Sequence, residues 1–221
     1  MKIKYAIFDV GQTIYPFTLK PLNDYMQERT SEPELFNNRH TVFNYDYKPY
    51  MKGEITDEEF AHELCFFCRV PYNNTILPII NQKLHAGCGK PFKETITAMQ
   101  ELKEANIKIG ILSNALPILH DTKINLVPKK YAFTSYELKS LKPDCQIYEL
   151  LAQKLNASYE EILFIDDKEK NITTANQLGI NGIVYNRDTI LQDINSYLPE
   201  NLPHLSANVK HTVFDHIDMN R

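Results

Sequence analysis

The chain has 221 residues, of which 43% are hydrophobic and 24% are charged, as in an ordinary globular protein. Its formal net charge of −4, without a cluster of Lys and Arg, gives no reason to expect a nucleic-acid partner. No apolar run is long enough to span a bilayer, and the N-terminus leads directly into a strand pattern without a secretion signal. We therefore expect a cytoplasmic protein with no membrane partner; its oligomeric state is not indicated.

The first strand is predicted over the apolar run Ile3–Phe8, which ends at Asp9. Residues 15–85 are rich in Tyr, Phe, Asn and Glu, and their hydrophobic spacing is helical, with a loop or short helix at 45–50. One helix is predicted to begin after Thr56, because three acidic residues and then a helical apolar pattern follow it. We predict a helical cap at 15–85, inserted into an α/β core formed by 1–14 and 86–221.

The second part of the core alternates strands with helices. We predict helices over 93–104, 143–155, 170–178 and 189–198, and strands over 107–112, 131–134, 162–165 and 180–185. Pro143 suits a first helical position, and Gly179 suits the end of the third of these helices. This alternation predicts an α/β fold with a doubly wound parallel sheet, a Rossmann-like core.

Polar residues stand at the ends of four predicted strands or at the starts of helices. The four segments are Asp9–Thr13, Ser113–Asn114, Lys142–Asp144 and Asp166–Asp167. Each alone is explained by a turn or a helix cap. Because the carboxyl ends of parallel strands lie along one edge of the sheet, the order of the four segments favours a single cleft in which they all meet.

Such a cleft suits phosphoryl transfer through an aspartate. A carboxylate that attacks a phosphate is repelled by it, and Mg²⁺ on oxygen ligands relieves that repulsion. A lysine neutralises charge on the transferred group, while a hydroxyl and backbone N–H groups hold its oxygens. The aspartyl-phosphate is then hydrolysed in a second step.

The four segments resemble the four motifs of the haloacid dehalogenase-like hydrolase superfamily, and the helical block resembles its cap insertion. The likeness covers about residues 4–197. Within the superfamily, Gly53–Phe60 and Ala175–Ile180 are most similar to the α-glucose-1-phosphatase-like branch. The resemblance implies a Mg²⁺-dependent phosphatase that hydrolyses a small phosphorylated metabolite, such as a sugar phosphate, through an aspartyl-phosphate.

The resemblance also assigns roles to residues. It implies that Asp9 and Lys142 are catalytic, that Asp9, the carbonyl of Gly11, Asp166 and Asp167 hold Mg²⁺, and that Gly11, Ser113, Asn114 and Lys142 bind phosphate. Asp167 is the expected carboxylate ligand from the fourth motif, with Asp166 as an alternative or water-mediated one. Asn171 stands where many relatives carry a further acid, one turn after the pair.

Gly11 departs from the pattern of strongly active relatives, which carry there an Asp that acts as general acid and base. That role is worth roughly a hundredfold to ten-thousandfold. We therefore expect a leaving group that needs little protonation, as in a sugar 1-phosphate or an acyl phosphate; the alternative is that another acid, from the cap or from the substrate itself, donates the proton. The alternatives are a low-activity binding or regulatory protein on the same scaffold, a sugar phosphomutase, and a 2-haloacid dehalogenase, against which the acidic pair argues.

The cap is expected to close over the cleft and to choose the substrate. Its polar and aromatic residues of first interest are Arg39, His40, Tyr45, Tyr47, Tyr50 and Arg69. Cys65 and Cys68 have CxxC spacing but lie in an apolar helical pattern, so we expect reduced, buried thiols rather than a metal site. The tail after Pro199 shows little pattern.

Overall fold

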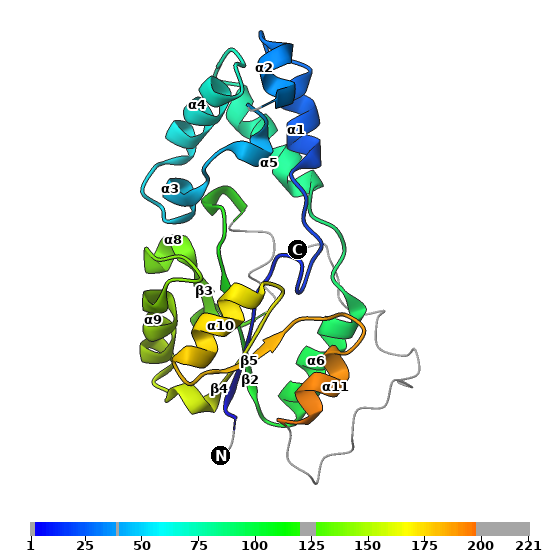
Figure 1. Ribbon diagram of the computed structural model, residues 1–221, viewed down its shortest axis with the longest axis vertical. Coiled ribbons are helices and arrows are strands. Elements are labelled where there is room, and N and C mark those ends of the chain that lie inside the picture. Colours follow the sequence, from blue (N-terminus) through cyan, green and yellow to red (C-terminus); the bar gives the residue numbers. More distant parts are fainter. Residues whose placement is uncertain (1–2, 39, 120–126, 198–221) are drawn as a thin grey trace.

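The computed structural model describes residues 3–38, 40–119 and 127–197. It has two lobes, an α/β core and a helical cap (Figure 1). The core holds a five-stranded parallel sheet in the order β3-β2-β1-β4-β5, which confirms the predicted α/β class. The strands are β1 (Tyr5–Phe8), β2 (Lys108–Ser113), β3 (Ala132–Thr134), β4 (Ile162–Asp166) and β5 (Asn181–Val184).

Helices cover both faces of the sheet (Figure 1). On one face lie α8 (Ser135–Leu138), α9 (Cys145–Leu155) and α10 (Glu169–Gln177), and on the other lie α6 (Lys93–Glu104) and α11 (Ile190–Asn195). Single 3₁₀ turns occur at η2 (Pro117–Leu119), η4 (Lys129–Tyr131) and η5 (Tyr159–Glu161). Every residue of β1 and β4 is buried, as expected of strands covered on both sides.

The predicted helix over 93–104 is confirmed, whereas the one predicted to start at Pro143 begins later. The backbone of Asp144 is extended, with φ −61° and ψ 135°, so α9 starts at Cys145. Gly179 follows α10 with φ +91°, a left-handed conformation that glycine adopts without strain. The helix predicted over 189–198 is shorter in the structure, where α11 ends at Asn195. Residue 198 and the tail after Pro199 lie outside the described residues.

The cap consists of short helices around its own apolar cluster. They are α1 (Lys20–Gln27), α2 (Pro33–Asn38), η1 (Val42–Asn44), α3 (Lys48–Met51), α4 (Asp57–Phe67) and α5 (Ile76–Ala86). The predicted start of α4 is confirmed, because Thr56 and Glu59 each accept a hydrogen bond from the backbone N–H of the other. Among the described helices, none combines the length and the apolar character that a membrane crossing requires.

The two cysteines of the CxxC pattern are fully buried in this cluster as free thiols. Burial raises the pKa of Cys65 to about 11 and that of Cys68 to about 12, so both are protonated near neutral pH. Protonated thiols are poor metal ligands and poor nucleophiles. The expectation that these side chains pack as small hydrophobes is therefore in keeping with their burial.

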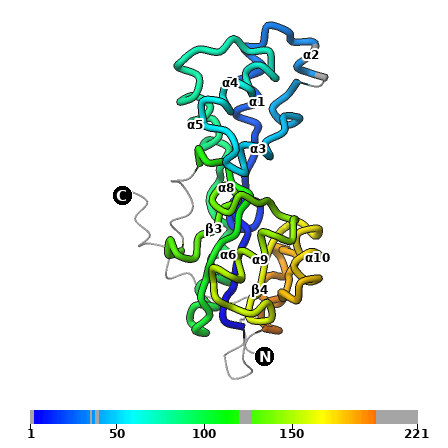
Figure 2. Tube along the Cα trace, turned by 90° about the vertical axis from the view of Figure 1, so that its left-hand side faces the viewer, coloured from blue at the N-terminus to red at the C-terminus, as the bar shows by residue number. Residues whose placement is uncertain are grey.

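The cap stands above the core in Figure 2, and two neighbouring segments join them. The N–H of Thr18 donates to the carbonyl of Gly87 at 2.9 Å, and the N–H of Gly89 donates to that of Pro16 at 2.9 Å. The cap also contacts the core through Ser135, whose Oγ donates to the carbonyl of Met51 at 2.6 Å. The exact boundaries of the cap, at 15 and 85, stay a prediction.

We expect Gly87→Ala to destabilise the protein, because the added Cβ would stand 2.0 Å from the carbonyl oxygen of Thr18. Overpacking of this kind costs about 1–3 kcal/mol of unfolding free energy, to be measured by urea denaturation. Gly11→Ala is the matched control: no atom lies within 4 Å of its added Cβ, so its unfolding free energy should stay within about 0.5 kcal/mol of the original. Equal stabilities of the two variants would contradict the prediction.

Candidate active site

The sheet brings the predicted site residues to one edge. Asp9 directly follows β1, and its N–H continues the ladder by donating to Ile165 of β4 at 2.8 Å. Ser113 is the last residue of β2, and Asp166 is the last residue of β4. The strand order reverses beside β1, and in open α/β sheets ligands bind at the carboxyl ends of strands at this point.

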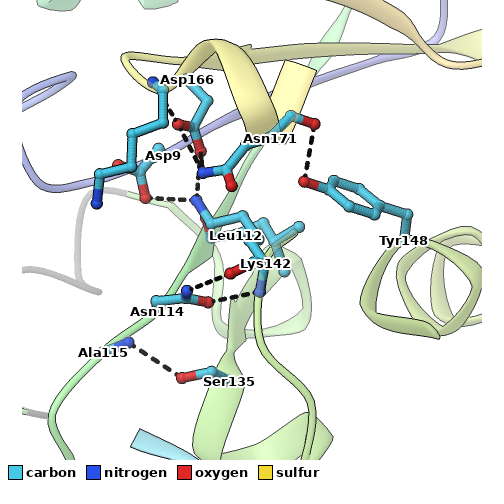
Figure 3. A network of polar contacts seen from close by, with 10 residues as sticks. Asp9, Leu112, Asn114, Ala115, Ser135, Lys142, Tyr148, Asp166 and Asn171 are labelled. Carbon is cyan, nitrogen blue, oxygen red and sulfur yellow. Dashed lines mark hydrogen bonds and ion pairs between the residues drawn. The ribbon is translucent and has the colours of Figure 1, made fainter. Parts of the chain in front are cut away.

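The side chain of Lys142 is buried between two carboxylates (Figure 3). Its Nζ lies 2.6 Å from Asp9 Oδ1, 2.6 Å from Asp166 Oδ2 and 2.8 Å from the carbonyl oxygen of Leu112. These contacts engage all three donors of the ammonium group. Burial by itself would lower the pKa of Lys142, but the charges of Asp9 and Asp166 raise it above its ordinary value, so the lysine is positively charged.

Asn171 holds Asp166 in place (Figure 3). Its Nδ2 lies 2.8 Å from Oδ1 and 2.9 Å from Oδ2 of Asp166, whose Oδ1 also accepts the N–H of Lys168 at 2.8 Å. The backbone carbonyl of Asn171 accepts a hydrogen bond from the hydroxyl of Tyr148 at 2.9 Å. The sequence indicated this position only as one where many relatives carry an acid. Its place five residues after Asp166, in the first turn of α10, was the available signal for a contact with Asp166.

Asn114 fixes the backbone of Lys142 through two reciprocal hydrogen bonds. Its Nδ2 donates to the carbonyl of Lys142 at 2.9 Å, and its Oδ1 accepts the N–H of Lys142 at 2.9 Å. The family resemblance implied only that Asn114 binds phosphate. The side-chain role was missed because residues 114 and 142 are brought together only by the tertiary fold.

The acidic cluster fits a divalent cation. Oxygen atoms of Asp9, Asp166 and Asp167 all lie within 4.8 Å of one another, and the buried Oδ1 of Asp167 has no hydrogen-bond partner. Burial raises the pKa of both Asp9 and Asp167, and the charge of Asp166 raises each further, although Lys142 opposes the shift at Asp9. Three carboxylates near two ammonium groups, those of Lys142 and Lys168, leave an excess of negative charge that Mg²⁺, which prefers oxygen ligands, would offset. Since both oxygens of Asp166 are already bonded, Asp9 and Asp167 are better placed as ligands.

A cavity of about 370 Å³ opens above the cluster and reaches the cap. Predicted site residues on its wall are Asp9, Gly11, Ser113, Asn114 and Lys142. The remaining wall residues are Val10, Gln12, Tyr15, Phe17, Leu19, Tyr47, Met51, Cys88, Ala115, Leu116, Leu119, Thr134, Lys168 and Asn171. The structure thus gathers the residues of the four motifs around one space or directly beneath it.

Of the cap residues of first interest, Tyr47 alone lies on the described wall of this cavity. Tyr50 is fully buried and stacks on Phe60 with ring centroids 4.0 Å apart, while the hydroxyl of Tyr45 donates to Glu63 at 2.8 Å. The ring of His40 lies against Phe67, and the guanidinium of Arg69 lies over Phe66. Arg39 lies outside the described residues.

Position 11 leaves open space where an acid would stand, since no atom lies within 4 Å of a Cβ built on Gly11. The neighbouring Gln12 has φ 61°, and its Nε2 donates to the carbonyl of Phe17 at 2.8 Å. Tyr15 lines the cavity, but burial raises the pKa of its phenol and makes it a weaker acid. On the described wall, Asp9 is the sole residue with a carboxyl group.

A parallel α/β sheet with a capped carboxylate–lysine site at its edge defines a class of hydrolases. A family model described as haloacid dehalogenase-like hydrolase matches residues 3–179, and the chain belongs to this family. It is 25% identical over 187 residues to the sesquiterpene phosphatase astK of Aspergillus oryzae, covering 81% of this chain and 88% of the relative. It is 30% identical over 93 residues to an (S)-2-haloacid dehalogenase of Pseudomonas, a match that covers 40% of each protein.

Solved structures share the fold. A HAD family enzyme of Bacteroides thetaiotaomicron, solved as a magnesium complex, aligns with a TM-score of 0.69 at 20% identity and covers 85% of this chain and 95% of that one. The same enzyme with magnesium and inorganic phosphate aligns with a TM-score of 0.66 at 19% identity, over 84% and 95% of the two chains. The narrower resemblance to the α-glucose-1-phosphatase-like branch stays a prediction.

We expect Asn171→Leu to lower the free energy of unfolding by about 1–3 kcal/mol, because both oxygens of buried Asp166 lose a donor. Thermal or urea unfolding checks this. Thr173→Ala, at an exposed position of the same helix, should change stability by less than about 0.5 kcal/mol. An Asn171→Leu protein as stable as the Thr173→Ala protein would show that Asp166 does not depend on this amide.

We expect the affinity for Mg²⁺ to rise with pH through the acid range, by at most about tenfold per unit for each proton released. Burial raises the pKa of Asp9 and Asp167, so protons compete with the metal at higher pH than for an ordinary aspartate. Calorimetric titrations at pH 5.5 in two buffers of different ionisation enthalpy measure the released protons. Identical heats in both buffers would contradict the prediction.

Proposed function

We propose that the protein is a Mg²⁺-dependent phosphatase that hydrolyses small phosphate monoesters through a phosphorylated Asp9. The observation that carries the proposal is the meeting of Asp9 and charged Lys142 on the wall of one cavity, with a carboxylate oxygen of Asp167 within 4.8 Å of one of Asp9 and the Oδ1 of Asp167 unpaired. Membership of the family, and the likeness to a relative named as a sesquiterpene phosphatase, support a phosphatase. Its location is proposed to be cytoplasmic, with no nucleic-acid partner.

In the proposed mechanism Asp9 attacks phosphorus, and Lys142 stabilises both the nucleophile and the charge on the phosphoryl oxygens. All three donors of Lys142 are engaged by protein atoms, so a bond to phosphate requires that one of them be exchanged. Ser113 and the backbone N–H groups of Gly11 and Asn114 are proposed to hold the remaining oxygens. Asp166 positions the ammonium, and Asn171 holds Asp166 in place.

Asp9, the carbonyl of Gly11 and Asp167 are the proposed ligands of Mg²⁺, with Asp166 beside them. When bound, the ion supplies positive charge that lets a carboxylate approach a phosphate. The carboxylate cluster fits an oxygen-preferring ion because one buried oxygen of Asp167 lacks any protein partner. This ligand set rests on side chains that lie within 4.8 Å of one another.

The open space at Gly11 bears on the leaving group. No carboxyl group other than that of Asp9 stands on the described wall to protonate it. We therefore propose a substrate whose leaving group departs without a strong general acid, as that of an acyl phosphate does.

A second candidate function is that of a 2-haloacid dehalogenase, which the partial likeness to the Pseudomonas dehalogenase favours. Halide leaves without a proton, so Gly11 is no handicap to that reaction. The metal-suited acidic cluster speaks against it. A low-activity binding protein on the same scaffold would bind phosphate esters without turning them over.

We expect Asp9→Asn to lower kcat on acetyl phosphate by about a thousandfold or more, since an amide cannot form the covalent intermediate. Removal of Mg²⁺ by EDTA should have a similar effect, reversed by added Mg²⁺. Phosphate release measures both effects, and Asp188→Asn at an exposed loop position is the control. Phosphatase activity that survives both treatments would overturn the proposal, and metal-independent halide release from 2-chloropropionate would favour the dehalogenase.

A further inference from the structure

The wall of the cavity above the phosphate end is apolar. It is formed by Phe17 and Leu19 from the segment that enters the cap, by Tyr47 and Met51 from the cap, and by Leu116 and Leu119 from the segment after β2. The charged residues on the described wall are Asp9, Lys142 and Lys168, which belong to the polar floor or adjoin it. An organic group that extends from a bound phosphate toward the cap therefore meets hydrocarbon and aromatic surface.

Several polar side chains on this wall are already paired with protein atoms. Gln12 Nε2 donates to the carbonyl of Phe17 at 2.8 Å, and the hydroxyl of Tyr47 donates to the carbonyl of Val42 at 2.9 Å. The hydroxyl of Thr134 donates to Glu137 at 2.7 Å. A sugar would leave several hydroxyl groups without partners on such a wall, and unpaired polar groups are costly to bury.

The lack of an acidic side chain at Gly11 further narrows the choice of leaving group in the substrate. An aliphatic alcohol is a very weak acid, so its oxygen leaves phosphorus slowly without a proton donor, and no carboxyl group stands at Gly11 to supply one. The oxygen of a phenol, whose pKa is about 10, leaves far more easily as the anion. A phenyl or naphthyl group is also apolar, and the aromatic rings of Phe17 and Tyr47 suit it as stacking partners.

We propose that the substrate is a phosphate monoester of an apolar phenol, an aryl phosphate. This inference rests on the proposed phosphatase function and names the substrate class of the same site. An apolar cavity of about 150 Å³ already admits benzene. The 370 Å³ available here leaves room for a phosphoryl group and one or two fused rings.

The reaction balances without a further reactant. An oxygen of Asp9 bonds to phosphorus while the bond from phosphorus to the aryl oxygen breaks, and the phenolate leaves with the electron pair and takes a proton from water. Water then adds its oxygen to phosphorus, the bond between phosphorus and Asp9 breaks, and the carboxylate is restored. One proton of that water stays on the inorganic phosphate, and the other passes to solvent and replaces the proton taken by the phenolate.

The first test compares kcat/KM, with Mg²⁺, for 1-naphthyl, phenyl, hexyl and glucose 6-phosphates. We expect both aryl esters to exceed hexyl and glucose 6-phosphates by at least about tenfold, and 1-naphthyl to exceed phenyl phosphate because it fills more of the wall. Hexyl phosphate matches the apolar character without the good leaving group. Equal or better turnover of hexyl or glucose 6-phosphate would overturn the proposal.

The second test separates the role of Gly11. For phenyl phosphates whose substituents vary the pKa of the phenol, kcat/KM, which reports the step in which the phenolate leaves, should fall steeply as that pKa rises. Gly11→Asp should flatten this dependence and raise kcat/KM for hexyl phosphate by about a hundredfold, the size of a general-acid contribution. A flat dependence in the original protein would show that another group protonates the leaving oxygen, and would overturn the leaving-group part of the inference.

The third test addresses the wall. Met51→Gln keeps the side-chain length but makes it polar, and should lower the ratio of kcat/KM for 1-naphthyl phosphate to that for acetyl phosphate by about fivefold or more. Phe66→Gln, at a cap residue 75% exposed and away from the cavity, should leave this ratio unchanged. An unchanged ratio in Met51→Gln would overturn the assignment of the wall.

Acetyl phosphate distinguishes a failure of the aryl preference from a failure of the proposed phosphatase function. If it is hydrolysed with Mg²⁺ while aryl phosphates show no advantage, the aryl preference is wrong and the phosphatase stands. If neither acetyl phosphate nor any of the phosphate esters is hydrolysed, the proposed function fails. Calorimetric binding to the Asp9→Asn protein then still tests the wall, since 1-naphthyl phosphate should bind more tightly than glucose 6-phosphate, and the reverse order would overturn the aryl assignment as well.

Discussion

Lys142 places a positive charge between Asp9 and Asp166, 2.6 Å from each, where its side chain is 2% exposed. Buried charges are tolerated only when they are paired and hydrogen-bonded. The fold meets this requirement from three directions, because Asn114 holds the backbone of the lysine, Leu112 accepts its third donor and Asn171 holds Asp166. The position of Asp9 at the floor of the cavity therefore depends on a network that extends well beyond it.

The same network links the floor of the cavity to its wall. Ser113 ends β2 at the wall of the cavity, and the segment after it runs from Asn114 to Leu116, which is buried in the apolar cluster of the cap. Ser135 Oγ accepts the N–H of Ala115 at 3.1 Å and donates to the carbonyl of Met51 in the cap. The residues that we propose to contact the organic part of the substrate thus lie on the same short segments as those that we propose to bind its phosphate.

The sequence predicted the sheet and the position of the site because strand ends are local features. An apolar run followed by Asp9, or by Asp166 and Asp167, is visible without tertiary information, and parallel strands must bring such ends together. The pairing of Asn114 with Lys142, 28 residues apart, was not predictable, since no pattern connects them. The apolar wall was missed for the same reason: Phe17, Met51 and Leu119 are distant in sequence, and Tyr45 and Tyr50 drew attention although they serve the interior of the cap.

The chain leaves the core near Pro16 and returns near Gly89, and these two positions are hydrogen-bonded neighbours. Phe17, Leu19, Tyr47 and Met51 lie between these two positions, whereas Asp9, Lys142 and the acidic pair lie outside them. The wall that we propose to contact the organic group is therefore carried mostly by one inserted segment, and the proposed catalytic groups by the core. Substitutions in the inserted segment can change the wall without altering the residues that surround Lys142.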